Sequence, residues 1–190
     1  VCLDVEHDGH SGYTLARLRA ELRTWYGAIE RPQILLLMAG SNDLAWSVPV
    51  DISVDSIALG YVELMDLALS LDPELLVVAA TIAPQSSRPV EGSGFDRAVL
   101  AGRYNELVRE RVARHRHFGE RLWLADVEPV LSLTDLYDGI HPSREAADKI
   151  GDAWLKVLLP LVDAKSARLG VGERRLGPSQ SVAHPTPTGR

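Results

Sequence analysis

Two near-continuous apolar runs constrain the fold more strongly than any other feature of this sequence. They cover residues 33–39 and 74–82. A strand without polar–apolar alternation is typically buried on both faces, as in a parallel sheet covered by helices. Each run follows a segment whose apolar residues recur at helical spacing. Strands that alternate with helices predict an α/β fold with a parallel sheet and right-handed crossovers.

The same patterns predict the remaining elements. Apolar residues at positions 15, 18, 22, 25 and 29 predict a first helix, and a second stripe from Ile57 to Leu71 predicts another. A third helix is expected over residues 96–116, a strand over 121–127, and a last helix after Pro142. Residues 83–94 and 128–141 are expected to be loops.

Length and composition limit the class of protein. The 190 residues suffice for one well-buried domain, predicted over residues 1–162 and followed by a disordered Gly/Pro/Ser/Arg-rich tail over 163–190. A net charge of -6 argues against nucleic-acid binding, and the apolar run 34–39 is far too short to span a bilayer. The single cysteine excludes an internal disulfide. Because the first residue is not methionine, we expect coding sequence upstream, and the compartment stays open.

Asp138 and His141 are the first candidates for chemistry. They lie three residues apart in the loop after the last predicted strand, where parallel sheets gather functional groups. A general base needs an imidazole whose far nitrogen is held by an acceptor, which the carboxylate would provide. Taken alone, the same spacing is more often that of a turn whose aspartate caps backbone groups and whose histidine packs under a helix.

Two further stretches accompany this pair. Gly9-His10-Ser11-Gly12-Tyr13-Thr14 precedes the first helix, and Gly40-Ser41-Asn42-Asp43 follows the first apolar run. The second stretch alone is also a good turn sequence. In this order, and in these loops, the three stretches resemble the SGNH (GDSL-type) hydrolases, serine esterases with four short sequence blocks. The resemblance covers about residues 5–160.

The resemblance implies a three-layer α/β/α sandwich of flavodoxin-like layout and an esterase site. Gly12 matches a glycine whose N–H binds the oxyanion, and Asn42 matches an asparagine whose amide does the same. Asp138 and His141 match the catalytic pair. The implied reaction is hydrolysis of a carboxylic ester through an acyl-enzyme, without metal or cofactor. The implied substrates are acylated carbohydrates, lysophospholipids or other small esters, with residues 10–14 favouring carbohydrates.

The sequence departs from the family in one respect. The first block, Gly-Asp-Ser with the nucleophile, is not present in these residues, and Gly92-Ser93-Gly94 has the wrong spacing for a Gly-x-Ser-x-Gly elbow. Ser11 and Ser41 are the serines nearest the matched blocks. We expect a domain that lacks its first strand and is inactive alone. The alternative is a non-catalytic binding protein, a pseudoenzyme that retains the pocket.

The missing block has a structural consequence. In the family the first strand is central, in a sheet of order 2-1-3-4-5, so its absence would leave the strand at 33–39 with an unpaired edge.

Two other features have less specific explanations. Trp46 lies just after Asn42 and is a candidate for the substrate pocket, although ordinary packing explains it equally well. His7 and His10, with Asp4 and Asp8 nearby, are too loosely spaced to predict a metal site. The resemblance accounts for them better, since related esterases often carry a similar Glu-Gly-His-Ser-Gly stretch.

Overall fold

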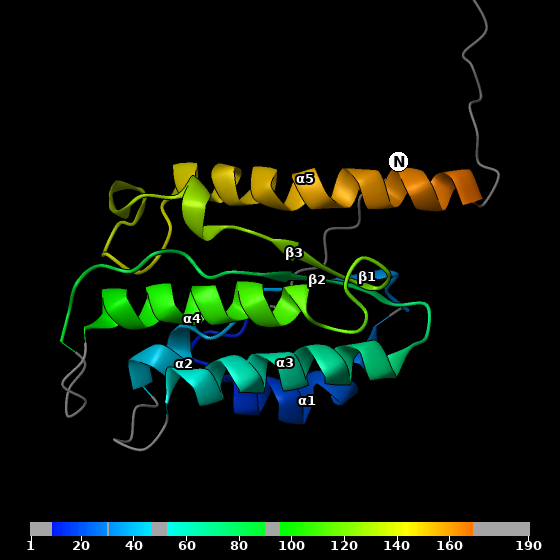
Figure 1. Ribbon diagram of the computed structural model, residues 1–190, viewed down its shortest axis with the longest axis horizontal. Coiled ribbons are helices and arrows are strands. Elements are labelled where there is room, and N and C mark those ends of the chain that lie inside the picture. Colours follow the sequence, from blue (N-terminus) through cyan, green and yellow to red (C-terminus); the bar gives the residue numbers. More distant parts are fainter. Residues whose placement is uncertain (1–8, 30, 47–52, 90–95, 169–190) are drawn as a thin grey trace, which may run out of the picture. The chain divides into compact units, whose positions relative to one another are not determined.

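The computed structural model describes residues 9–29, 31–46, 53–89 and 96–168 (Figure 1). The chain divides into a unit that ends at Leu158 and a second unit that begins at Leu159. Three strands form a parallel sheet of order β1-β2-β3, namely β1 (Ile34–Leu37), β2 (Leu76–Ala80) and β3 (Leu122–Ala125). The sheet confirms the predicted α/β class, because each of the three predicted strands is present and parallel to its neighbour.

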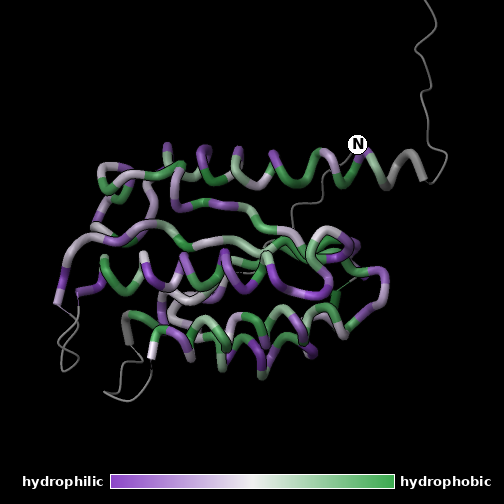
Figure 2. The backbone as a smooth tube through the Cα atoms, in the orientation of Figure 1, coloured by the Kyte–Doolittle hydropathy of each residue, from purple (hydrophilic) through white to green (hydrophobic). Residues whose placement is uncertain are grey.

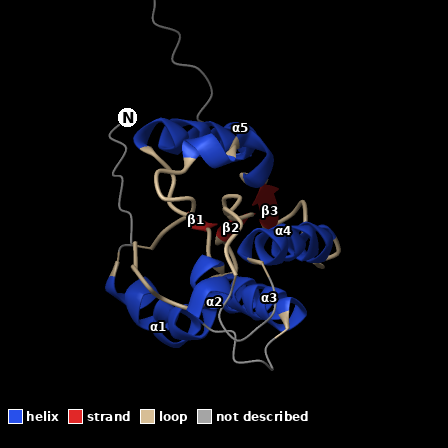
Figure 3. Ribbon diagram, turned by 90° about the vertical axis from the view of Figure 1, so that its left-hand side faces the viewer, coloured by secondary structure: helices blue, strands red, loops and turns tan. Residues whose placement is uncertain are grey.

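Helices cover both faces of the sheet. On one side lie α1 (Leu15–Ala28), α2 (Ser41–Trp46), α3 (Val54–Leu71) and α4 (Arg97–Ala113), as Figure 3 shows. The part of α5 (Arg144–Arg168) that belongs to the first unit lies on the other side. The predicted three-layer α/β/α arrangement is therefore confirmed. No described helix combines the length and the apolar character that crossing a membrane requires.

The largest buried side chains lie between the sheet and the helices of the first face. Tyr61 and Leu64 of α3 and Tyr104 of α4 are at most 1% exposed. Figure 2 shows that hydrophobic and hydrophilic residues alternate along the helices. The apolar run at 74–82 predicted a buried strand, and four of the five residues of β2 are indeed buried.

Two buried tyrosines fix the carboxyl end of β1. The Tyr61 hydroxyl donates to the Leu37 carbonyl at 2.6 Å, and the Tyr104 hydroxyl donates to the Ala39 carbonyl at 2.8 Å. Gly40 follows with a φ of 114°, and a Cβ at this position would lie 2.4 Å from the Tyr104 hydroxyl oxygen. Glycine is therefore required here both for its backbone conformation and for the close approach of the ring.

The outer edge of β1 is unpaired within the described part of the chain. β1 pairs with β2 alone, in agreement with the open edge predicted for residues 33–39. Leu36 and Met38 are 43% and 44% exposed at this edge, whereas Val78, the β2 partner of Leu36, is fully buried. Large apolar side chains on an unpaired edge form a surface that proteins usually cover.

The carboxyl-terminal helix is longer than predicted. The domain end at residue 162 and the disordered tail from 163 remain predictions, and α5 continues past residue 162, through Pro160 to Arg168. A proline removes one helical hydrogen bond, but Leu, Ala, Lys and Arg after it favour helix and allow it to resume. The remainder of the predicted tail, 169–190, lies outside the described residues.

Substitutions should separate the uncovered edge from the core. Leu64→Ala removes a side chain that is 1% exposed and should lower the free energy of unfolding by about 2–5 kcal/mol. Leu36→Ala should lower it by less than half as much, since its side chain is already largely in water. Urea unfolding of the two variants makes the comparison. Equal losses would show that another part of the chain covers Leu36 in solution.

Candidate active site

The parallel sheet gathers three loops at one edge. Residues after β1, β2 and β3 leave the same carboxyl edge, toward the left of Figure 1. This edge is where open α/β sheets hold their ligands. The predicted candidates Asn42, Asp138 and His141 all lie in these loops or directly after them.

Asp138 and His141 form a hydrogen-bonded pair, as predicted. Asp138 Oδ2 lies 2.7 Å from His141 Nδ1, while its Oδ1 accepts the backbone N–H of His141 at 2.8 Å and that of Ile140 at 3.0 Å. The backbone N–H of His141, and then its ring, lower the pKa of the Asp138 carboxyl to about 2. The carboxylate therefore stays ionised at neutral pH and holds the imidazole through Nδ1. The ring is 62% exposed, and no hydroxyl of a described residue is bonded to Nε2.

The loop after β2 holds the turn that carries this pair. The Ser86 N–H donates to the Gly139 carbonyl at 2.8 Å, and Arg88 Nη2 donates to the Asp138 carbonyl at 3.4 Å. Gly139 has a φ of 82°, and a Cβ there would lie 2.2 Å from Ser86 Oγ. A side chain at residue 139 would therefore separate the two loops. No sequence pattern indicates this contact, because it joins residues more than 50 positions apart.

A network of polar side chains fixes the start of the loop after β3, which carries the Asp138–His141 pair. Arg109 of α4 donates to both oxygens of Asp126, at 2.8 and 2.9 Å, and to Glu128 at 2.6 Å. The fully buried Thr81 donates to Asp126 and accepts the N–H groups of Val127 and Glu128. The two carboxylates raise the pKa of Arg109. The loop thus leaves β3 in a fixed direction, because its first backbone groups have protein partners.

Tyr137 is a neighbour of His141 that sequence reasoning missed. Its ring lies nearly parallel to the imidazole, at 18°, with centroids 5.6 Å apart, and the residue is 71% exposed. The only signal in the sequence was an aromatic residue directly before Asp138. An aromatic ring left in water beside a candidate general base is available to contact a ligand.

The other half of the site joins the loop before α1 to α2. Asn42 Nδ2 donates to the Tyr13 carbonyl at 2.9 Å, which brings the two predicted oxyanion stretches together. Asp43 accepts the Leu15 N–H through both carboxylate oxygens, at 3.2 and 3.0 Å. Gly12 has a φ of 76°, and beyond its two chain neighbours no atom lies within 4 Å of the place where a Cβ would stand, so one side of its backbone is open.

The remaining sequence candidates have other surroundings. Ser11 is exposed and Ser41 begins α2; neither is hydrogen-bonded to His141. Trp46 ends α2, but its side chain lies outside the described part of the structure. His10 stacks on Trp25 at 3.9 Å and on Tyr13 at 4.7 Å. Asp4, His7 and Asp8 lie outside the described residues, and the described ones contain no group of three metal-ligating side chains.

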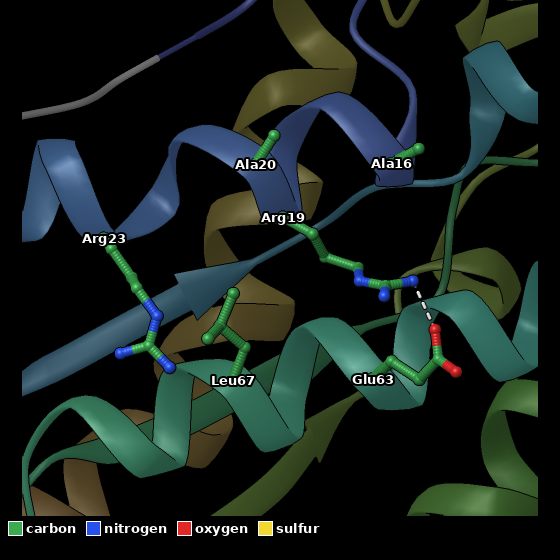
Figure 4. Close-up of a pocket in the computed structure, with 6 residues that line it drawn as sticks. All are labelled: Ala16, Arg19, Ala20, Arg23, Glu63 and Leu67. Carbon is green, nitrogen blue, oxygen red and sulfur yellow. Dashed lines mark hydrogen bonds and ion pairs between the residues drawn. The ribbon is translucent and has the colours of Figure 1, made fainter.

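A hollow of about 460 Å³ between α1 and α3 is not part of this site. Figure 4 shows that Arg19 and Arg23 of α1 point toward α3, where Arg19 pairs with Glu63. Its lining residues all belong to the two helices and include none of the candidates above.

The low pKa of Asp138 predicts a pH dependence of stability. A carboxyl whose folded-state pKa lies near 2 contributes fully above its unfolded pKa of about 4, and the contribution is lost as the pH falls toward 2. Asp138→Asn should therefore destabilise the chain at about pH 6 and make little difference near pH 2, as measured by urea unfolding. Asp135, whose pKa is also near 2, is present in both proteins and cancels in the comparison. An equal loss of unfolding free energy in Asp138→Asn at both pH values would contradict the low pKa of Asp138 in the folded protein.

Comparisons with known proteins point to one family. The chain is similar in sequence to a multidomain esterase of Ruminococcus flavefaciens, at 25% identity over 169 residues, 80% of this chain. The chain spans only a fifth of the length of that relative. Its fold is similar to a family 3 carbohydrate esterase of Clostridium thermocellum, with a TM-score of 0.68, 21% identity, and coverage of 85% of this chain and 73% of that one.

A carbohydrate esterase family 3 structure from Talaromyces cellulolyticus gives a TM-score of 0.69 at 20% identity, over 85% of this chain and 73% of the other. Identities this low establish the fold alone. The family model of the GDSL-like lipase/acylhydrolases, by contrast, matches residues 2–149, more than half of the chain. The matched region contains the loop before α1, the start of α2 and the Asp138–His141 turn. This chain therefore belongs to the GDSL-like lipase/acylhydrolase family.

Proposed function

We propose that this domain hydrolyses carboxylic esters with His141 as the general base and Asp138 as the group that orients it. The observation that carries the proposal is the 2.7 Å contact between Asp138 Oδ2 and His141 Nδ1. With Nδ1 held, Nε2 takes the proton of a nucleophilic hydroxyl and returns it to the leaving alcohol. Asp138, ionised at neutral pH, stabilises the imidazolium that forms in between.

Gly12 and Asn42 are proposed to bind the oxyanion. The tetrahedral intermediate places negative charge on one oxygen, and fixed neutral donors lower that barrier. Asn42 donates one amide hydrogen to the Tyr13 carbonyl, which orients the group and leaves the second hydrogen for the oxyanion. The open side of Gly12 lets an ester approach its backbone N–H. The mechanism uses neither a metal nor a cofactor.

The nucleophile is proposed to reside on a strand that pairs with the outer edge of β1. Three observations support this placement: the unpaired edge, the exposed apolar side chains of Leu36 and Met38, and His141 Nε2 without a bonded hydroxyl in the described residues. A serine directly after such a strand would enter the same carboxyl edge as His141. Translation of the DNA upstream of residue 1 tests it. A strand followed by Gly-Asp-Ser within about 30–70 residues, one βα unit with loops, agrees with the proposal.

An in-frame stop just upstream would instead favour a second function. The protein would then be a pseudoenzyme that binds an ester or its product without cleaving it. One observation favours a pseudoenzyme: among the described residues, no hydroxyl is bonded to the exposed His141.

Acylated carbohydrates are the proposed substrates. The exposed ring of Tyr137 beside His141 provides a flat apolar surface with a polar end, which suits a sugar ring better than an acyl chain. The similarity in fold to carbohydrate esterases agrees with this choice but does not decide it. Faster hydrolysis of a lysophospholipid than of an acetylated sugar would reject it.

The protein extended through its upstream block should depend on His141. His141→Ala should lower the rate of p-nitrophenyl acetate hydrolysis by several orders of magnitude, as removal of a triad member does, with little effect on folding because the side chain is exposed. The 190-residue chain should show no hydrolysis above its own His141→Ala control. If the extended His141→Ala variant kept more than about a tenth of the rate, the barrier would have changed by less than about 1.4 kcal/mol. That result would exclude His141 from the mechanism.

Asn42→Ala in the extended protein should act on the transition state. We expect kcat to fall by about 10²–10³ with little change in KM, because the donor strengthens as charge develops. Steady-state kinetics over a range of ester concentrations separates the two parameters. A higher KM with an unchanged kcat would make Asn42 a residue that binds the ground state.

A further inference from the structure

We propose that Asp43 is a positioning residue that sets the oxyanion site by capping α1 from a distant part of the chain. The inference rests on the proposed function, because it concerns the geometry of Gly12 and Asn42. The Asp43 carboxylate holds the segment that follows Gly12, and Asn42 at the adjacent position holds the same segment by another atom.

The start of α1 lacks a local cap. The first N–H groups of a helix have no partner within the helix, and a Ser, Thr, Asp or Asn at the N-cap usually accepts one of them. Thr14 occupies that position in α1, but its side chain makes no capping hydrogen bond. Asp43, 28 residues away, accepts the Leu15 N–H instead. Leu15 and Asp43 are 3% and 8% exposed, so water is poorly placed to replace the carboxylate.

Together the two neighbouring side chains bond to two residues of the segment after Gly12. Asn42 binds the Tyr13 carbonyl and Asp43 binds the Leu15 N–H, so the backbone directly after Gly12 is bonded at two points. Gly12 itself has an open side and a backbone conformation that glycine tolerates easily. The bonds to residues 13 and 15, together with the turn bond from the Tyr13 N–H to the His10 carbonyl at 3.3 Å, therefore set where the Gly12 N–H points relative to the Asn42 amide.

Of the two segments joined by the Asp43–Leu15 bond, α2 is held more firmly than the loop that contains Gly12. Leu44 of α2 is fully buried, and its N–H donates to the Gly40 carbonyl at 3.2 Å. The residue before Gly40, Ala39, is bonded to the buried Tyr104. Loss of the Asp43 carboxylate should consequently move the Gly12 loop and leave Asn42 in place, which separates the two donors of the oxyanion site.

A cap that only stabilised α1 would not need the charge of the Asp43 carboxylate. Its burial raises the pKa of its carboxyl, which means that keeping this group ionised works against folding. Asparagine in its place would remove the charge and keep one oxygen for the Leu15 N–H. Stability and positioning are thus separable at this residue: Asp43→Asn keeps an acceptor, whereas Asp43→Ala removes it.

Kinetics of the extended protein test the inference. Asp43→Ala should lower kcat for p-nitrophenyl acetate by about 10²-fold, the effect of one misplaced oxyanion donor, and change KM by less than about threefold. Asp43→Asn should restore kcat to within about tenfold of the unsubstituted protein. Ser53→Ala is the matched control, because it removes the N-cap of α3, whose Oγ accepts the Ser56 N–H at 3.2 Å, and no hydrogen bond among the described residues joins Ser53 to Gly12 or Asn42.

Two kinetic outcomes would overturn the inference: a kcat for Asp43→Ala no lower than that of Ser53→Ala, or a failure of Asp43→Asn to recover activity while remaining folded. Amide NMR spectra of the same proteins give a readout independent of turnover. The Gly12 and Tyr13 resonances should move in Asp43→Ala and stay near their positions in Asp43→Asn. If His141→Ala leaves the rate intact while these shifts occur, the proposed function fails and the positioning of the loop stands. Unmoved Gly12 and Tyr13 resonances would reject the positioning itself.

Discussion

Parallel pairing of β1, β2 and β3 is the constraint on which the rest of the structure depends. Because the three strands run in one direction, their carboxyl ends share an edge, and residues distant in sequence meet there. The Ser86–Gly139 contact joins the loops after β2 and β3, and the Tyr104–Ala39 bond joins α4 to the end of β1. A sheet with alternating strand directions would place these loops at opposite ends.

The sequence predicted the elements well, because burial and periodicity are local properties. The runs at 33–39 and 74–82 contain β1 and β2, and the stripe from Ile57 to Leu71 lies within α3. The six-residue α2 was missed, since Gly-Ser-Asn-Asp also suits a turn. The helix past Pro160 was missed as well, because a proline usually ends a helix.

The site was predictable only in part. Asp138 and His141 are near in sequence and belong to a family pattern, and the predicted hydrogen bond between them is present. The roles assigned to Gly12, Asn42, Asp138 and His141 remain predictions. Asp43 and Tyr137 could not be found from the sequence, because their importance comes from contacts with Leu15 and with the imidazole. Local patterns contain no information on a cap supplied from 28 residues away.

The central proposal is that this chain supplies the base and the oxyanion donors, and that the nucleophile stands on a strand beside the edge of β1 that is unpaired within the described residues. Labelling the extended protein with a fluorophosphonate, which reacts with activated serine hydroxyls, and mapping the labelled peptide by mass spectrometry tests this claim most directly. We expect a single labelled serine upstream of residue 1, and loss of the label in His141→Ala. A label on Ser11, Ser41 or any other serine within the 190 residues would contradict it.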